Sequence, residues 1–136
     1  MPDFERLVFF GTPEFAVPTL SALVAAGRSP LLVVAQPARP AGRGRELREP
    51  AVAQWARERG LPVEQPERVR APEFLERMRA LRPTVAVVAA FGQIFSSELL
   101  AIPPAGCLNV HASLLPRWRG AAPIQAALAA GDRSPG

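Results

Sequence analysis

Two polar side chains near the end of an apolar segment are the first candidates for chemistry. Only Val110 separates Asn109 from His111, so the period-two geometry of a β-strand would place both side chains on one face. His111 is the only histidine, and imidazole is the side chain whose ordinary pKa suits proton transfer near neutral pH. Polar groups on a buried strand cost stability unless they are hydrogen-bonded, so the pair is either a satisfied structural pair or part of a site.

Other chemistries lack the residues that they need. The first apolar run turns through Gly11-Thr12-Pro13, which is not the glycine-rich turn of a dinucleotide site, and no Walker sequence occurs. One histidine and one cysteine do not make a zinc site, so we expect no metal. Cys107 has no partner for an internal disulfide and lies in an apolar run, so we expect a core residue.

Apolar runs and helix breakers predict alternating strands and helices. Strands are expected at residues 7–10, 31–35, around 63, 84–91 and 108–112. Helices are expected from Pro13 to before Gly27, and at residues 50–59, 73–82, 96–100 and 121–130. Thr12 is expected to cap the first helix and Ser96 or Ser97 the fourth, whereas the prolines and glycines of residues 36–45 predict an irregular loop.

This alternation predicts the α/β class, with a Rossmann-like, mostly parallel sheet that carries helices on both faces. Sites in such sheets lie at the carboxyl ends of the strands. No apolar run is long enough to cross a bilayer and the acidic start does not resemble a signal peptide, so a cytoplasmic protein is expected. All 16 basic residues are arginine and the net charge is +4, which suits an acidic partner but also a thermophilic or GC-rich source.

Four segments carry a resemblance to a known family. Residues 111–125 read His-Ala-Ser-Leu-Leu-Pro-Arg-Trp-Arg-Gly-Ala-Ala-Pro-Ile-Gln, and residues 9–18 read Phe-Phe-Gly-Thr-Pro-Glu-Phe-Ala-Val-Pro. Residues 36–45 read Gln-Pro-Ala-Arg-Pro-Ala-Gly-Arg-Gly-Arg, and residues 91–94 read Phe-Gly-Gln-Ile. Together they resemble the folate-dependent formyltransferases, most closely the branch that acts on methionyl-tRNA.

The resemblance implies an activity and a catalytic pair. The activity is transfer of a formyl group from 10-formyltetrahydrofolate to the amino group of initiator methionyl-tRNA, in translation initiation. Asn109 and His111 match two of the family's three catalytic residues. An amine that attacks a formyl carbon builds negative charge on the oxygen, and the amide of Asn109 and protonated His111 can donate hydrogen bonds to it. His111 can also carry the proton of the amine to the departing folate nitrogen.

The same resemblance implies two binding regions. The folate would lie against a wall formed by four consecutive residues, Ser113, Leu114, Leu115 and Pro116. Its pterin ring would be recognised by the backbone of a second loop, formed by Phe91, Gly92, Gln93 and Ile94. The tRNA acceptor end would meet the loop that carries Arg39, Arg43 and Arg45, with Arg43 as the expected reader, although composition alone favours a solvated surface loop there.

In the family, the third catalytic residue is an aspartate that follows the matched segments, and a tRNA-binding barrel comes after it. We therefore expect residues 1–136 to be an incomplete N-terminal domain, without the final strands of its sheet and without the barrel. Such an incomplete chain should be inactive alone. The full-length protein should be a monomer. Phe91 stands where tyrosine is usual. The alternatives are a hydrolase, a glycinamide ribonucleotide transformylase, although Gly11-Thr12-Pro13 is not its phosphate loop, or a non-catalytic fragment that binds folate or tRNA.

Overall fold

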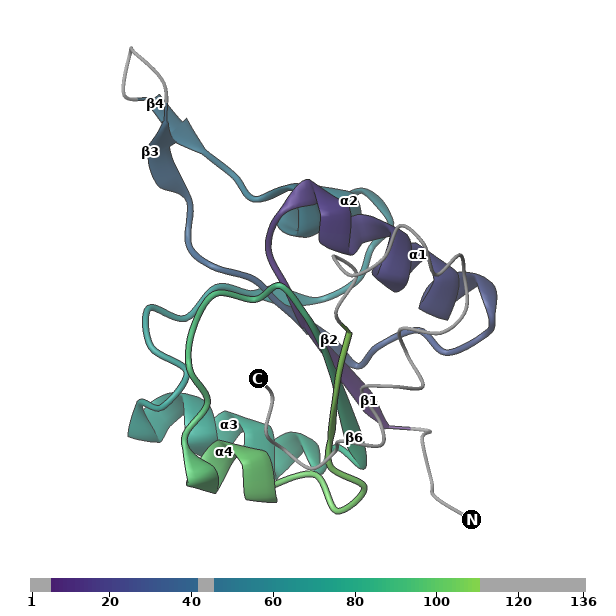
Figure 1. Cartoon of the computed structure of the whole chain (residues 1–136), viewed down its shortest axis with the longest axis vertical. Helices are drawn as coiled ribbons and strands as arrows, with labels where there is room; N and C mark the ends of the chain where they lie inside the picture. The colour runs from purple at the N-terminus through teal and green to yellow at the C-terminus, as the bar shows by residue number, and fades with distance from the viewer. Residues whose placement is uncertain (1–5, 42–45, 111–136) are drawn as a thin grey trace.

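The computed structural model describes residues 6–41 and 46–110, and in them one parallel sheet forms the centre (Figure 1). Its strand order is β5-β2-β1-β6-β7. The five strands are β1 (Leu7–Gly11), β2 (Leu32–Val34), β5 (Val63–Glu64), β6 (Val85–Ala89) and β7 (Cys107–Asn109). In the register, Phe9 lies between Val33 and Val87. The predicted α/β class and parallel sheet are confirmed.

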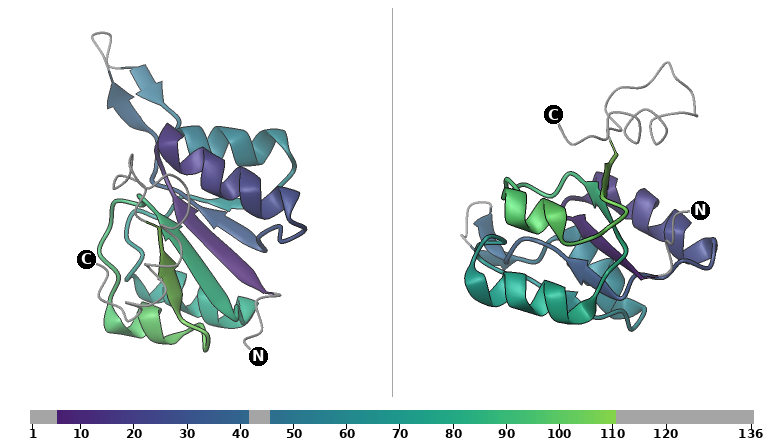
Figure 2. Two further views of the ribbon diagram at one scale, coloured as in Figure 1. Left: turned by 45° about the vertical axis from the view of Figure 1, so that its right-hand side comes forward. Right: turned by 90° about the horizontal axis from the view of Figure 1, so that it is seen from below.

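Helices cover both faces of this sheet (Figure 2). A short 3-10 turn, η1 (Glu14–Ala16), leads into α1, and the helices are α1 (Val17–Ala25), α2 (Ala51–Glu58), α3 (Pro72–Leu81) and α4 (Ser97–Ala101). One face carries α1 and α2, and the other carries α3 and α4. These bounds agree with the predicted ones to within a few residues, whereas the helix predicted at residues 121–130 lies outside the described residues.

Strand β1 separates two apolar layers. All five of its residues are buried, because a parallel strand in a sheet covered on both faces has no solvent side. Leu7 and Phe9 pack into the layer under α1 and α2, and Val8 and Phe10 into the layer under α3 and α4. Burying one such aromatic side chain contributes about 2–3 kcal/mol.

The helix ends are closed in different ways. Ser96 caps α4, because its Oγ accepts a 3.1 Å hydrogen bond from the backbone N–H of Leu99, as the sequence predicts. Arg6 closes the end of α3 by donating from Nε and Nη2 to the carbonyl of Leu81. The prediction that Thr12 caps the first helix is wrong. Its hydroxyl bonds to two other loops instead, and neither η1 nor α1 has a side-chain cap.

The sequence predicts an irregular loop at residues 36–45, but part of this segment forms a strand. β3 (Arg39–Ala41) pairs antiparallel with β4 (Glu46–Arg48), and this hairpin projects away from the sheet (Figure 1). Pro40 lies inside β3 opposite Leu47. A two-stranded ribbon has two open edges, so a residue without an N–H costs no hydrogen bond when its nitrogen faces outward. Proline-rich composition therefore did not exclude a strand here.

Among residues 6–41 and 46–110, no helix combines the length and the apolar character that a membrane span needs. Within the same residues there is no group of three or more histidine, cysteine, aspartate or glutamate side chains that could hold a metal ion.

Candidate active site at the carboxyl ends of the strands

Four loops meet at the carboxyl edge of the sheet, because parallel strands all end on the same side. Thr12 follows β1, Gln36 follows β2, Gln65 follows β5, and the predicted folate loop, residues 91–94, follows β6. Hydrogen bonds between these loops form a connected polar network. The network therefore sets the position of the predicted folate loop.

Thr12 is the point at which three of these segments are joined. Its backbone N–H donates to the carbonyl of Ala90 (3.2 Å), and its hydroxyl donates to the carbonyl of Phe91 (2.7 Å). The same hydroxyl accepts from the N–H of Gln36 (3.3 Å), and the carbonyl of Thr12 accepts from Val52 at the start of α2 (3.2 Å). All the hydrogen-bonding groups of Thr12 are therefore engaged, which explains why it does not cap the first helix.

Gln93 connects the 91–94 loop to two other segments. Its Nε2 donates to Oε1 of Gln36 (2.8 Å) and to the carbonyl of Pro66 (3.3 Å). Its Oε1 accepts from the N–H of Val69 (2.8 Å). A side chain held at both amide atoms is a support for the loop rather than a free contact for a ligand.

Gln65 holds the base of the β3–β4 hairpin. Its Nε2 donates to the carbonyl of Gln36 (3.0 Å) and to Oε1 of Glu49 (3.1 Å), two residues that lie just before β3 and just after β4. Arg57 of α2 donates to Oε1 of Gln65 and forms an ion pair of 3.1 Å with Glu49. Both sides of the Arg57–Glu49 pair are partly exposed, so we attribute little stability to its charge alone.

The backbone of residues 90–92 lies partly in the left-handed region. Ala90 has φ +56° and Gly92 has φ +105°, both in the left-handed half of backbone space. A Cβ atom built on Gly92 would lie 2.7 Å from Nε2 of Gln36, so the backbone and the Gln36 side chain are in close approach. Only glycine satisfies both conditions at position 92.

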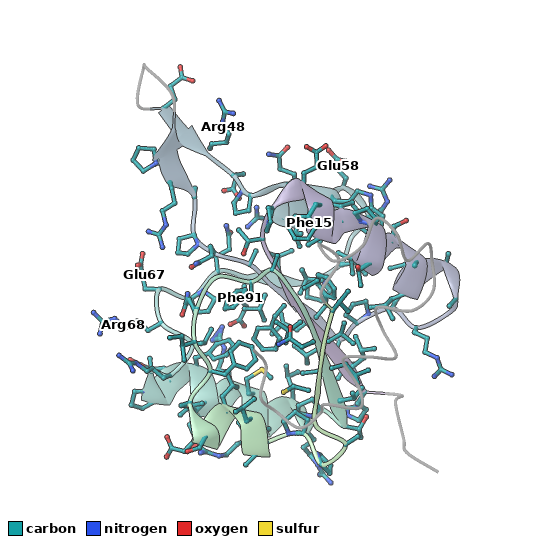
Figure 3. All side chains as sticks on the ribbon, in the orientation of Figure 1. Phe15, Arg48, Glu58, Glu67, Arg68 and Phe91 are labelled. Carbon is teal, nitrogen blue, oxygen red and sulfur yellow. The ribbon has the colours of Figure 1, made fainter. Side chains whose placement is uncertain are left out.

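The four residues of the predicted folate loop have different surroundings. The Phe91 ring is buried beside Phe10, with ring centroids 5.4 Å apart, so it belongs to the core. Gln93 is held by the network, and Gly92 and Ile94 are exposed, the latter to 88%. The backbone near Gly92 and the side chain of Ile94 are therefore the parts that face outward. Figure 3 shows the Phe91 side chain directed inward between the layers.

Asn109 lies on the strand at one side of the described sheet. It pairs with Val88, and it shares a face with Cys107, which packs against the layer under α3 and α4. Burial raises the pKa of the Cys107 thiol to about 11, which fits the predicted core position and not a reactive thiol. His111 and the predicted wall from Ser113 to Pro116 lie outside the described residues, so their geometry toward Asn109 stays a prediction.

The predicted tRNA-binding arginines are described only in part. Arg39 is exposed at the start of β3, whereas Arg43 and Arg45 lie outside the described residues. Directly opposite Arg39 in the hairpin is Arg48, which the sequence analysis did not select. Residues that face each other across two strands point to the same side, so two guanidinium groups share one face of the hairpin. Such a like-charge pair favours an anionic partner there.

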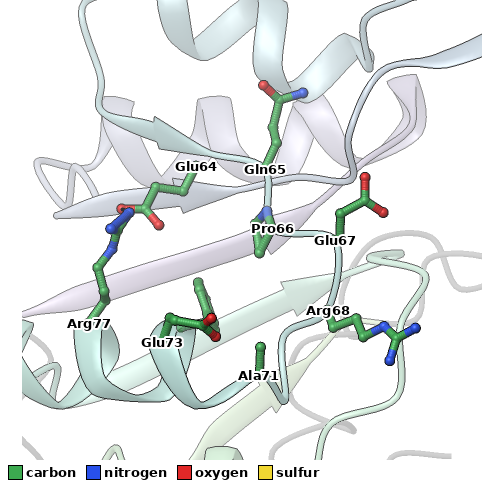
Figure 4. Close-up of a pocket in the computed structure, with 9 residues that line it drawn as sticks. Glu64, Gln65, Pro66, Glu67, Arg68, Ala71, Glu73 and Arg77 are labelled. Carbon is green, nitrogen blue, oxygen red and sulfur yellow. Dashed lines mark ion pairs between the residues drawn. The ribbon is translucent and has the colours of Figure 1, made fainter.

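The described residues also form two open grooves away from this network. One, of about 470 Å³, lies between β5 and α3, and Arg77 forms an ion pair with Glu64 in it (Figure 4). The other, of about 990 Å³, is at the amino end of the sheet, beside Arg6 and Pro104. Neither of these two grooves includes Asn109 or residues 91–94.

Sequence reasoning missed the residues that support the site, namely Thr12 as a junction, Gln36, Gln65 and Glu49. One signal was present. Gln36-Pro37 and Gln65-Pro66 each begin within two residues after the end of a parallel strand. Proline holds the backbone extended there, and the glutamine side chain spans the gap to the next loop.

Comparisons with known proteins agree on one family. A family model described as "Formyl transferase" matches residues 5–136. The methionyl-tRNA formyltransferase of Methylococcus capsulatus is 58% identical over 131 residues, which cover 96% of this chain and 42% of that protein. That of Halorhodospira halophila is 60% identical with the same coverage. The chain therefore spans 42% of the length of these curated relatives.

Solved structures show the same fold at lower identity. Glycinamide ribonucleotide transformylase 1 from Geobacillus kaustophilus superposes with a TM-score of 0.58 and 20% identity, covering 95% of this chain and 69% of that one. Phosphoribosylglycinamide formyltransferase from Brucella melitensis gives a TM-score of 0.58 at 20% identity, covering 95% and 68%. At this identity the likeness supports the fold and not the substrate.

Proposed function

Because this chain belongs to the formyl transferase family, we propose that it supplies the folate side of an active site that formylates initiator methionyl-tRNA. The donor is 10-formyltetrahydrofolate. The observation that carries the proposal is 58–60% identity to methionyl-tRNA formyltransferases over 131 residues. The network of Thr12, Gln36 and Gln93 supports it, since it holds the 91–94 loop with backbone and Ile94 facing outward.

The chemistry is an acyl transfer. The amino nitrogen of the methionyl group attacks the formyl carbon, and the carbonyl oxygen becomes negatively charged. When the bond between the formyl carbon and the folate nitrogen breaks, that nitrogen takes up a proton and the amine loses one. We assign oxyanion stabilisation to Asn109 and His111, and proton transfer to His111. The residues from Ser113 to Pro116 are the proposed wall for the folate.

The proposed tRNA contact is the arginine-bearing hairpin. Arg39, Arg43 and Arg45 are the proposed ligands of the acceptor end, and the position of Arg48 opposite Arg39 adds a fourth. Guanidinium groups bind phosphate with two hydrogen bonds each, which suits this role. Initiator tRNA and folate together suggest that the protein acts in the cytoplasm, and we propose a monomer when full length.

The test is a graft into a relative. The aligned part of the Methylococcus capsulatus enzyme is replaced by this chain, and formylation of initiator methionyl-tRNA is measured with 10-formyltetrahydrofolate. We expect formylation by the grafted enzyme and its loss in the His111→Ala variant. Glycinamide ribonucleotide is the control acceptor and should not react. A folded graft that formylates neither substrate, or that prefers glycinamide ribonucleotide, would contradict the proposal.

A further inference from the structure

The β3–β4 hairpin is attached to the body of the protein through its two ends. Among the described residues, β3 and β4 pair only with each other and join no other sheet. Figure 1 shows the hairpin extending away from the helices and the main sheet. Its direction must therefore be set where it begins and ends, near Gln36 and Glu49.

A single side chain bonds both of these positions. Nε2 of Gln65 donates to the carbonyl of Gln36 (3.0 Å) and to Oε1 of Glu49 (3.1 Å). In the close-up the Gln65 side chain points away from α3, whereas the neighbouring Glu64 points toward Arg77 (Figure 4). This is the alternation expected at the end of a strand, and it directs Gln65 to the base of the hairpin.

The base of the hairpin is also bonded to the 91–94 loop. Gln36, whose carbonyl accepts from Gln65, also accepts at Oε1 from Gln93 (2.8 Å). Arg57 holds Gln65 from the other side by donating to its Oε1 and by pairing with Glu49. Gln65 therefore contacts α2 through Arg57, and both ends of the hairpin through Gln36 and Glu49. Through Gln36 it is also linked to Gln93 of the 91–94 loop.

We propose that Gln65 is the positioning residue of the hairpin. By bonding the carbonyl of Gln36 and the carboxylate of Glu49, it fixes the direction of the hairpin relative to the 91–94 loop. That the hairpin thereby presents an acceptor RNA to the folate side rests on the proposed function.

The first experiment measures the direction of the hairpin without any substrate. Spin labels are attached to the full 136-residue chain at Leu47→Cys, which is 71% exposed on β4, and at Glu76→Cys on α3, with Cys107→Ala as background. The distribution of the distance between the labels is measured by pulsed electron resonance. We expect one narrow distribution in the parent and a broader or displaced one in Gln65→Met, which removes both donors.

Two further variants separate positioning from folding. Gln65→Glu keeps an acceptor for Arg57 but loses the donor, so it should broaden the distribution as Gln65→Met does. Gln54→Met removes a side chain that, among the described residues, bonds the carbonyl of Glu49 alone, and it should leave the distribution narrow. Circular dichroism confirms that all variants fold. Unchanged distributions in both Gln65 variants, or equal broadening in Gln54→Met, would overturn the proposal.

A second experiment reads the functional consequence. Binding of initiator methionyl-tRNA to the chain should weaken about fivefold in Gln65→Met, because about 1 kcal/mol of hydrogen bonding is lost. Binding of a non-reactive formyl-folate analogue should change less than about twofold on the same scale. If the parent binds neither ligand, the proposed function is contradicted. The distances between the spin labels still test whether Gln65 positions the hairpin. If it binds both ligands and Gln65→Met leaves tRNA affinity unchanged, the hairpin direction does not govern tRNA binding.

Discussion

Nε2 of Gln93 lies 2.8 Å from Oε1 of Gln36, although 57 residues separate them in the sequence and β1 lies between their strands. The two side chains thus bridge across the end of β1, above Thr12. This bridge brings the Gln36 amide against the backbone of Gly92. The 91–94 loop is therefore held by its neighbours rather than by its own sequence.

Gly92→Ala should destabilise the protein more than Gly106→Ala. Both glycines have positive φ, +105° and +92°, so both substitutions carry a backbone cost of about 1 kcal/mol. Of the two new Cβ atoms, only the one at position 92 meets another atom, Nε2 of Gln36. Moving this amide also moves its Oε1, which accepts the hydrogen bond from Gln93. We expect an additional loss of about 1 kcal/mol, measured by urea unfolding. Equal losses in the two variants would show that the contact with Gln36 does not matter.

Thr12→Val should cost about 1–3 kcal/mol of unfolding free energy, since it keeps the side-chain shape but leaves the Phe91 carbonyl and the Gln36 N–H without their partner. Thr84→Val is the matched control. Its hydroxyl also bonds a carbonyl and an N–H, both of Arg6, but in an exposed position where water replaces it. Equilibrium unfolding of the two variants gives the comparison, and a larger loss in Thr84→Val would refute this account of Thr12.

Arg48→Glu should stabilise the hairpin and weaken RNA binding. Arg39 and Arg48 face each other, and opposite charges at such a position are favourable by a few tenths of a kcal/mol to about 1 kcal/mol. Initiator tRNA binding should weaken and its salt dependence should become shallower. Arg28→Glu makes the same charge change at an exposed residue just before β2, at the opposite edge of the sheet. A similar loss of affinity in both variants would mean that only net charge acts.

Cys107 should react slowly with iodoacetamide at pH 8. Burial raises the pKa of its thiol from 9.0 to about 11, so the reactive thiolate is scarcer by about a hundredfold than in an unfolded chain below pH 9. The alkylation rate of the folded protein should keep rising with pH beyond 9. Urea-unfolded protein should level off near 9 instead. A plateau near 9 in the folded protein would contradict the burial of this thiol.

Asn109→Ala in the grafted enzyme should lower kcat by about 10²–10³-fold, which is the usual effect of removing one donor to an oxyanion. Asn109→Asp keeps the size but replaces the donor with a negative charge, so it should not restore the rate. Thermal unfolding should be nearly unchanged for Asn109→Ala, because the side chain is only half-buried on β7. A large loss of stability with a normal kcat would assign Asn109 a structural role.

The sequence was informative where local pattern decides the structure. Apolar runs such as residues 85–89 predict buried strands, and Ser96 predicts a helix start, because each depends on neighbours within a few positions. Thr12 shows the limit of this reasoning. A threonine before a helix is a good cap, but here its hydroxyl bonds the carbonyl of Phe91 and the N–H of Gln36 instead, and both come from distant loops.

The hairpin and the support of the site depend on the same kind of distant contact. Proline and glycine between residues 36 and 45 are compatible with a loop or with a two-stranded ribbon, and only the pairing partner decides. Gln65 reaches a carbonyl 29 residues earlier, and Gln93 reaches a side chain 57 residues earlier. The residues with candidate chemistry could be selected from the sequence, whereas the residues that hold them could not.

The central place of β1 also has a consequence for the order of assembly during synthesis. The residues of β1 pair with residues of β2 that lie about 24 positions later in the chain. On the other edge they pair with residues of β6 that lie about 78 positions later. Contacts of such long sequence separation form slowly, and an open strand edge with exposed Phe10 is prone to association with other chains. We expect the nascent chain to be most vulnerable to aggregation between the emergence of β2 and that of β6, and to benefit from chaperone binding in that interval.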